Sequence, residues 1–507
     1  MMKKTRLLAL LTILPASLAS AQPKPGASEV PVVAKPLEAD ALPERFDLDR
    51  VLQEPGVPWS IAKIAQRSAR TVHLVEAADR RIDQAVATTQ EARAAAIPQL
   101  DLRARYTRLS PIDNAPLAPI PIDFDTARAA AANVADPNAQ ALWQEQIDVL
   151  QGISEGTIDV PRNQYSFRAS VRYPLLALFV QILPGIRTAQ NAETARRYES
   201  NVARNEAALE LIQIYMDHAR ARGALAVAEL ALRQAEANRA QAEALLRGGV
   251  GNRPDVARFE ARVALAERAI AESGADVEAT ANALRALLDI EGMGPLAFEE
   301  RLTEVPKPAF KESTGDLIEA AWKLRDEMQA ADALVRAREY AARSARGAMA
   351  PGVGVEAAVD YGRPNALYVP PVDDFRSSWN VSAVVSWSPD GTWAASRAKQ
   401  RVVAQEAEAK ARREQLKDLI RIEVVRAASA YRASFESVRA ARRQAEAAEE
   451  AYAAKRRSFE VGIFDATEVI DAEVDVNRAR LALIDAAARL RVRESALRTA
   501  IGEHLWE

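Results

Sequence analysis

Two carboxylates lie three residues apart at the start of a segment that the sequence predicts as a helix near the C-terminus. They are Glu468 and Asp471, and the predicted helix covers 466–502. A helix begins with unpaired N–H groups at the positive end of its dipole, so carboxylates are favoured in its first turn whatever the protein does. The pair is a candidate acidic site whose chemistry depends on what surrounds it.

Other residue types that could do chemistry form no constellation typical of an enzyme. The histidines His73, His218 and His504 are scattered without metal-ligand spacing, so each is expected to be solvated or part of a helical wall. There is no cysteine, which excludes disulfides, thiolate metal sites and catalytic thiols. No nucleophile elbow or phosphate-binding glycine loop occurs. We therefore expect no catalytic residue, no metal, no cofactor and no enzymatic activity.

The first residues have the order of a secretory signal. Lys3, Lys4 and Arg6 come before an apolar run, 7–14, and small residues lead to a cleavage site after Ala21. Without a cysteine, no lipid anchor of the lipoprotein type is available. The sequence predicts a mature chain outside the cytoplasm.

The charges of the chain favour no charged partner. The formal net charge is -3, from 67 basic and 70 acidic residues that are interspersed. This distribution lacks the basic patch typical of nucleic-acid binding.

Four segments alternate apolar and polar residues, which predicts strands with one apolar face. They lie at about 99–109, 164–173, 352–361 and 379–388. In all four, the apolar face has no charge and carries aromatic residues toward its ends. The opposite faces contain a mixture of signs that indicates a wetted wall, from Arg103, Arg105, Arg168, Arg172, Glu356 and Asp360.

Long helices are predicted after each pair of strands. Segments 186–247 and 393–461 each have more than 60 residues almost without glycine or proline, which corresponds to roughly 90 to 100 Å. Their apolar and small residues step by threes and fours, as in a coiled coil. Each helix is expected to reverse at a turn and return through 253–291 or 466–502. The predicted seams are Leu209, Ile212, Met216, Ala219, Gly223, Ala226 and Leu230, and Ile420, Val424, Ala427, Tyr431, Ser434, Val438 and Ala441.

The order of these elements occurs twice, which indicates an internal duplication. A helix, expected at about 59–96 and again at 316–348, precedes each pair of strands. The resulting division is a signal peptide at 1–21, an extended leader at 22–43, a first repeat at 44–292, a linker at 293–315 and a second repeat at 316–507.

The two halves of the chain differ in two features. The first half carries an inserted loop, 110–163, with a helical segment around 139–150. It also carries an apolar run, 175–183, which is either a membrane-interface segment or the start of a packed helix. That run is too short to span a bilayer as a helix.

Uncharged apolar faces with aromatic ends are typical of strands that face lipid, because only closed strand arrangements satisfy the backbone there. A soluble β-sandwich has the same alternation and is the alternative. Four strands cannot close a barrel, so several copies of the chain would be needed.

The duplicated order resembles the TolC-type outer-membrane efflux proteins over nearly all of the mature chain. The resemblance implies an α+β membrane protein in which four strands per chain contribute to a trimeric, twelve-stranded transmembrane β-barrel. This barrel would continue into a long α-helical coiled-coil barrel in the periplasm. The implied partners are two further copies, outer-membrane lipid, a periplasmic adaptor (membrane fusion) protein and an inner-membrane pump.

The resemblance also assigns a candidate gate. Glu468 and Asp471 fall at the acidic positions that narrow the closed tunnel in this family, and three copies around an axis would give a cation-selective ring. Glu468 is longer than the usual aspartate, and Phe464 replaces an arginine that can latch the gate. Adaptor contacts are implied at the two helical turns, with Gly249, Asp255, Gly462 and Phe464 as candidates.

The expected function is that of an exit duct in a tripartite efflux or type I secretion system, which passively conducts substrates that the pump delivers. The exported substrate, whether drug, metal or protein, stays open. The alternative is a periplasmic coiled-coil scaffold or adaptor, for which the long helices suffice. That alternative does not explain four strands with uncharged apolar faces.

Overall fold

The computed structural model of the chain describes residues 47–53, 56–110, 121–155, 161–249, 251–290, 294, 296–304, 308–368, 372–460 and 465–507. All of them belong to one unit, Asp47–Glu507. The predicted signal peptide and leader lie outside the described residues. Helices make up most of the described chain, and none of these helices is long and apolar enough to cross a membrane.

A four-stranded antiparallel sheet is formed in the order β2, β3, β5, β6. Its strands are β2 (Gln99–Arg108), β3 (Asn163–Tyr173), β5 (Gly352–Arg363) and β6 (Arg376–Ser386). The last strand begins three residues earlier than expected. Its ladder continues through Ser377 and Arg376, whose polar side chains interrupt the alternation that marks the rest of the strand.

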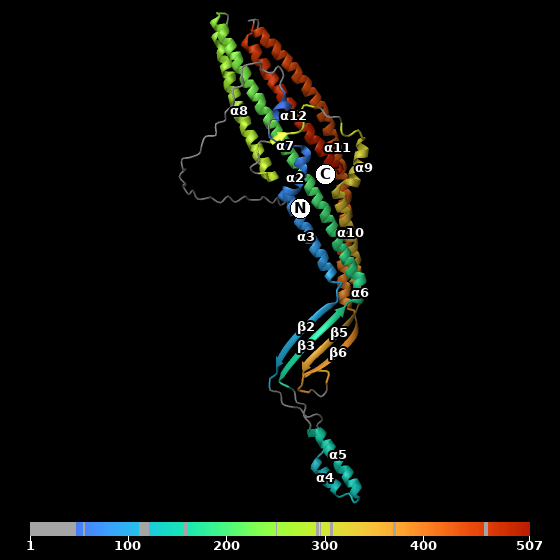
Figure 1. Ribbon diagram of the computed structural model, residues 1–507. Coiled ribbons are helices and arrows are strands. Elements are labelled where there is room, and N and C mark those ends of the chain that lie inside the picture. Colours follow the sequence, from blue (N-terminus) through green and yellow to red (C-terminus); the bar gives the residue numbers. More distant parts are fainter. Residues whose placement is uncertain are drawn as a thin grey trace, which may run out of the picture. The chain divides into compact units, whose positions relative to one another are not determined.

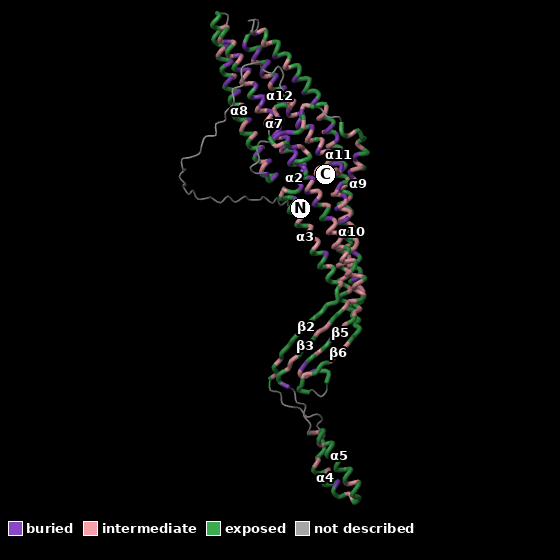
Figure 2. Tube along the Cα trace, in the orientation of Figure 1, coloured by how far each residue is buried: buried purple, intermediate pink, exposed green. Residues whose placement is uncertain are grey.

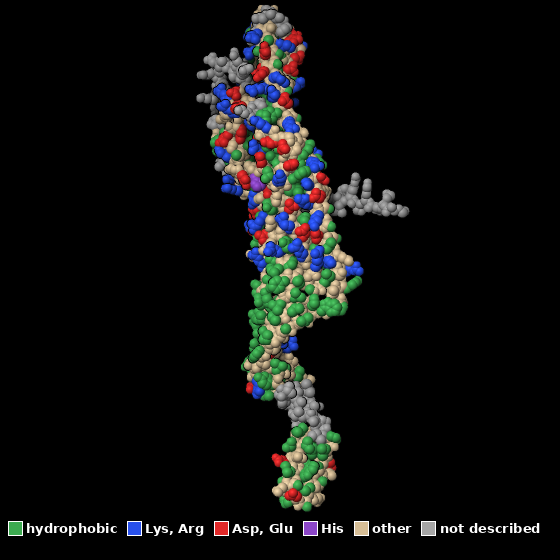
Figure 3. All heavy atoms as spheres, turned by 90° about the vertical axis from the view of Figure 1, so that its right-hand side faces the viewer, with side chains coloured by type: hydrophobic (Ala, Val, Ile, Leu, Met, Phe, Trp, Pro, Cys, Tyr) green, Lys and Arg blue, Asp and Glu red, His purple; other side chains and the backbone are tan. Residues whose placement is uncertain are grey.

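The register gathers the apolar residues of all four strands on one face. Leu102 lies opposite Ala169, which lies opposite Val359, which lies opposite Trp379. This face is uncovered in the chain: Leu102 is 71% exposed and Trp379 is 75% exposed. Apolar side chains gather over the strands and the adjoining helix starts, whereas charged side chains cover the long helices (Figure 3).

The four long helices lie next to one another in pairs (Figure 1). They are α7 (Leu183–Arg247), α8 (Arg253–Leu288), α11 (Pro389–Glu460) and α12 (Ala466–Ile501). Helix α7 packs against α8 and α12, and α12 also packs against α11. Most of the predicted seam is buried, including Ile212, Met216, Val424 and Val438 (Figure 2).

Both helices that precede the strand pairs are interrupted, which corrects the single helices expected there. The first consists of α2 (Ile61–Thr71) and α3 (His73–Ala94), and the second of α9 (Thr314–Leu324) and α10 (Asp326–Gly347). Val72 and Arg325 have extended backbones at the two interruptions. At the second, the guanidinium of Arg325 is buried between Glu327, at 2.6 Å, and Glu423, at 2.5 Å.

Trp59 lies in a strand and not in the first helix. Strand β1 (Val57–Trp59) pairs in parallel with β4 (Leu296–Phe298), which lies within the predicted linker. Pro58 disfavours a helix at this point. The side chain of Ser60 instead caps α2 by accepting a hydrogen bond from Lys63 N, and a short helix, α1 (Leu48–Leu52), precedes the strand.

The apolar run 175–183 is helical and packs in part against the chain, while Phe179 is 65% exposed, so a membrane-interface role stays open. It forms α6 (Leu175–Ala177) and a π-helical turn, η1 (Leu178–Ile182), which leads directly into α7. The turn packs against α10, where Ser344 donates a hydrogen bond to the carbonyl of Gln181 at 3.0 Å. Gly347 approaches this turn so closely that a Cβ would lie 2.0 Å from the carbonyl oxygen of Val180.

The insertion between β2 and β3 contains two helices where one helical segment was expected. They are α4 (Phe124–Ala132) and α5 (Pro137–Glu155). Helix α4 is alanine-rich and is capped by Asp123, which accepts hydrogen bonds from Asp125 N and Thr126 N. An ion pair of 2.8 Å between Arg128 and Asp148 joins the two helices.

Candidate periplasmic gate at the helical turns

The candidate acidic pair lies at the beginning of α12. Asp465 caps this helix, and its Oδ1 accepts a hydrogen bond from Glu468 N at 3.1 Å. Glu468 and Asp471 are both exposed, whereas their neighbours Val469 and Ala472 are buried. The cap satisfies the backbone, so both carboxylates are left available to solvent or to another charge.

A lysine on the preceding helix neutralises the charge of one of the two carboxylates. Lys455 Nζ of α11 lies 2.6 Å from Glu468 Oε2. This bond raises the pKa of Lys455, and the charges of Asp471 and Asp475 add to the effect. The candidate site is therefore a mixed cluster with an excess of negative charge.

Asp475 extends the acidic surface by one further turn. It is exposed and lies seven residues after Glu468, so that Glu468, Asp471 and Asp475 share one face of α12. Sequence reasoning missed both Asp475 and Lys455. The i, i+3, i+7 spacing could have revealed Asp475, and the antiparallel register of the two helices could have revealed Lys455.

Beneath this exposed face, a buried carboxylate joins the two helical pairs. Glu473 of α12 is 1% exposed, and its Oε1 lies 3.3 Å from Arg262 Nη2 of α8. Its Oε2 faces Asn238 of α7, whose amide donates to the hydroxyl of Tyr452 on α11 at 3.3 Å. Burial raises the pKa of Glu473, while Arg262 and Asn238 act in the opposite direction.

Two further contacts fix the helices near their turns. Arg258 of α8 donates to the hydroxyl of Thr467 at 3.0 Å, and Phe259 meets Phe459 of α11 edge to face, with centroids 5.5 Å apart. These contacts cross from one helical pair to the other. The acidic face of α12 is thus held on a rigid support.

The turn between α7 and α8 is built for a tight reversal. Gly249 has a φ of +78°, and Gly251 lies so close to Leu246 that a side chain would clash. Asn252 caps α8 by accepting from Asp255 N at 2.9 Å. Asp255 is only 9% exposed and pairs with Arg258. It therefore offers little surface to a partner protein.

The other two predicted turn residues, Gly462 and Phe464, lie outside the described residues. The adaptor contacts assigned to the turns stay a prediction.

The polar face of the sheet carries paired charges. Glu356 lies 2.9 Å from Arg172 and 3.6 Å from Arg168, which is also 3.9 Å from Asp360. Arg103 pairs with Asp101 on its own strand at 2.7 Å. This arrangement fits a wetted wall.

The histidines each have a local environment of their own. His218 is buried against Phe298, its Nδ1 lies 2.9 Å from the hydroxyl of Thr280, and burial lowers its pKa to about 4. His504 lies 2.8 Å from Asp326, and His73 is exposed.

Comparison with known proteins agrees with this geometry. The family model described as outer membrane efflux protein matches residues 317–503. Within these residues the chain is similar to the outer-membrane efflux proteins. The family that this model describes consists of outer-membrane efflux channels and not of enzymes.

Solved structures of outer-membrane channels share the fold of this chain. CusC is 16% identical, with a TM-score of 0.68 over 88% of this chain and 93% of that chain. OprN is 17% identical, with a TM-score of 0.68 over 91% and 97%. CmeC of Campylobacter jejuni is 13% identical, with a TM-score of 0.66 over 87% and 85%. No curated protein sequence matches the chain.

Proposed function

We propose that three copies of this chain form an exit duct of a tripartite efflux or type I secretion system. The four strands of each copy would contribute to a twelve-stranded barrel in the outer membrane, and the long helices would form a periplasmic tunnel. The observation that carries this proposal is the exposed apolar face of the sheet. Trp379, Val381 and Val385 are each 68 to 75% exposed, in an uncharged row that water would not favour.

The edges of the sheet support closure by further copies. Within the described residues, β2 and β6 are edge strands, so one side of each has unpaired backbone groups. Lipid cannot hydrogen-bond such groups, and an open edge in a membrane would cost several kcal/mol for each unsatisfied group. Pairing of β2 with β6 of the next copy would satisfy both edges.

The interior of the duct would be wet and mixed in charge. The ion pairs of Glu356 with Arg168 and Arg172 lie on the face opposite to Trp379. Side chains that neutralise one another do not select one class of solute. This supports a passive duct, for which the pump would determine the substrate.

An internal duplication would explain the chain's architecture. The order of two short helices, two strands and two long helices occurs in both halves. We attribute the insertion with α4 and α5 to the first copy alone, in a loop between strands that tolerates added chain.

The gate would be the acidic face of α12. In three copies, Glu468, Asp471 and Asp475 would surround the axis, and Lys455 would reduce their charge. An adaptor protein would contact the turns near Gly249 and Gly462. Cations would be favoured over anions at such a ring.

Fractionation followed by native mass spectrometry tests this proposal. The full chain should stay in the outer-membrane fraction after a carbonate wash and should be a trimer in detergent. A chain that washes off as a monomer would be a periplasmic scaffold, and the duct proposal would be wrong.

A further inference from the structure

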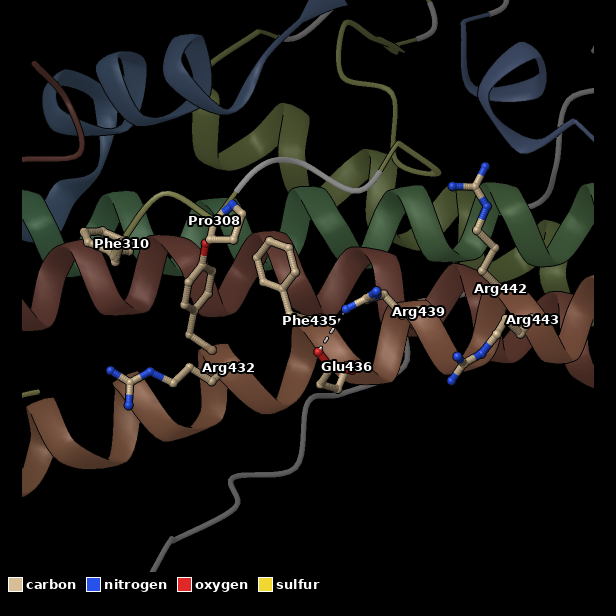
Figure 4. Close-up of a pocket in the computed structure, with 9 residues that line it drawn as sticks. Pro308, Phe310, Arg432, Phe435, Glu436, Arg439, Arg442 and Arg443 are labelled. Atoms are coloured by element: carbon tan, nitrogen blue, oxygen red, sulfur yellow. Dashed lines mark hydrogen bonds and ion pairs between the residues drawn. The ribbon is translucent and has the colours of Figure 1, made fainter. Parts of the chain in front are cut away.

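A groove with a volume of about 660 Å³ lies along α11 (Figure 4). Its apolar floor consists of Phe310, Tyr431 and Phe435, and Tyr431 is 3% exposed. Ala309 N donates a hydrogen bond to the hydroxyl of Tyr431 at 3.1 Å, which fixes the connecting segment over the helix. The groove is therefore a preformed feature.

Arginines line the rim of this groove. Arg432, Arg439 and Arg443 are exposed and follow one another at intervals of seven and four residues, so they share one face of α11. Glu436 offsets one of them, at 3.4 Å from Arg439. Within the described residues, Arg432 and Arg443 take part in no ion pair. The rim thus presents cations to a partner.

Helix α8 carries the complementary charge on the other side of the chain. Glu272 and Asp276 are exposed and lie four residues apart on a face with Leu265, which is 47% exposed. Alanines at 261, 275 and 279 lie close to this face and permit close approach of another helix. Asp276 takes part in no ion pair within the described residues, whereas Glu272 pairs loosely with Arg268 at 3.3 Å.

The two charged faces also lie at the same level along the helices. Counted from the contact of Phe259 with Phe459, Arg439 and Arg443 lie 20 and 16 residues away along α11, and Glu272 and Asp276 lie 13 and 17 residues away along α8. The contact of Phe259 with Phe459 places these two helix ends together. Away from the ends, α7 and α12 lie between α8 and α11.

We propose that the arginine-lined groove of α11 is completed by α8 of a second copy, with Glu272 and Asp276 against Arg439 and Arg443. This inference rests on the trimer of the proposed function and assigns its helical seam. In a closed ring, α8 at one edge of each copy meets α11 at the edge of the next. Opposite charges at matched level would fix the register of this contact and disfavour displaced arrangements.

Disulfide crosslinking tests the seam directly, because the chain contains no cysteine of its own. The full chain with Arg439→Cys and Asp276→Cys is oxidised in outer membranes and separated without reductant. Covalent dimers and trimers are expected to dominate. The matched control combines Arg439→Cys with Glu278→Cys, which lies on the other flank of α8, and should give only traces of crosslinked chain.

Charge reversal gives an independent readout by native mass spectrometry. R439E with R443E, and E272R with D276R, should each reduce the trimer fraction several-fold, and the four changes together should restore it. E267R with E278R makes the same charge change on the other flank and should leave the trimer intact. Full trimer in every variant, together with no crosslinking, would overturn the proposal.

Two remaining outcomes would each contradict the proposed seam in a different way. If the unmodified chain is a monomer, the trimer of the proposed function is wrong, and the assignment of the groove falls with it. If both reversals leave the trimer intact but R439E with R443E abolishes crosslinking to an acidic adaptor helix, the groove belongs to that partner and our assignment is wrong.

Discussion

Lys455 of α11 donates to the carboxylate of Glu468 on α12, with 2.6 Å between Nζ and Oε2. This contact crosses the turn between the two helices and places a cation within the acidic surface that we assign to the gate. The surface is therefore less negative than its carboxylates alone suggest. It can be made more or less negative by single substitutions.

The first prediction concerns ion selectivity. In three copies, removal of Lys455 changes the charge of the cluster from -3 to -6, because each chain has Glu468, Asp471, Asp475, one lysine and Arg478, which lies 3.8 Å from Asp475. Lys455→Met should raise the preference for cations, and Glu468→Ala with Asp471→Ala should reduce it. Reversal potentials in planar bilayers under a KCl gradient measure both changes.

Lys410→Met is the control for this experiment, because Lys410 pairs with Glu406 and Glu339 elsewhere on α11. It should leave the reversal potential unchanged. Equal selectivity in all variants would show that the acidic face of α12 does not line the constriction.

A second prediction concerns the buried carboxylate that joins the helical pairs. Glu473→Ala leaves the half-buried guanidinium of Arg262 without its partner, which costs roughly 1 to 3 kcal/mol in the free energy of unfolding. The melting temperature in detergent should fall accordingly. Glu473→Leu with Arg262→Leu should recover much of the loss, because an apolar pair removes both charges.

Asp475→Ala serves as the control for the buried pair, since Asp475 is exposed on the same helix. Its melting temperature should stay within a degree or so of the unmodified protein. A similar loss in both variants would mean that the effect does not arise from the buried pair.

Third, the stability of the fold should depend on pH through His218. Burial, assisted by Arg222 and Arg285, lowers its pKa from 6.5 to about 4. The unfolded chain therefore binds more protons between these values, so the stabilisation is full above pH 6.5 and is lost as pH falls toward 4. The total is about 3 kcal/mol for a shift of this size.

His218→Gln should flatten the melting temperature between pH 6.5 and 4, measured by differential scanning fluorimetry. His73→Gln should not, because His73 is solvated with 98% of its side chain exposed. Parallel pH profiles for all three proteins would contradict the role of His218.

A fourth prediction tests the junction between helix and sheet. Gly347→Ala places a Cβ against the backbone of Val180, where no flexible group can move away. We expect a loss of about 1 to 3 kcal/mol or more, because overpacking forces backbone shifts. The amount of folded chain in the outer membrane should fall, as measured by heat-modifiable gel mobility.

Gly274→Ala is the matched change in a helix. No atom lies within 4 Å of a Cβ at this position, so alanine should stabilise the helix by up to about 1 kcal/mol. If both variants behaved alike, the close approach at Gly347 would carry no cost.

The strands and long helices could be predicted from the sequence because each follows a period that its own residues define. The apolar rows of β3 and β5 alternate without interruption, and α7 has its seam at steps of three and four. Strands β1 and β4 could not be predicted. Each has three residues, and they pair across more than 230 positions of sequence.

Only the part of the candidate site that lies on a single helix could be predicted from the sequence. Glu468 and Asp471 are apparent as neighbours on α12, whereas Lys455 becomes part of the site only through helix packing across the turn. The resemblance implies an adaptor contact at Asp255, yet only 9% of this residue is exposed, which the sequence does not show. The interruption at Arg325 likewise depends on Glu423, which lies 98 residues away.

The central claim is that the apolar face of the sheet meets lipid while the opposite face meets water. The most direct measurement attaches an environment-sensitive fluorophore to Val381→Cys or to Ser382→Cys in the reconstituted, otherwise cysteine-free chain. We predict that a nitroxide lipid quenches the label at 381 and an aqueous quencher the label at 382. Equal aqueous quenching at both positions, with no effect of the lipid quencher, would contradict the account.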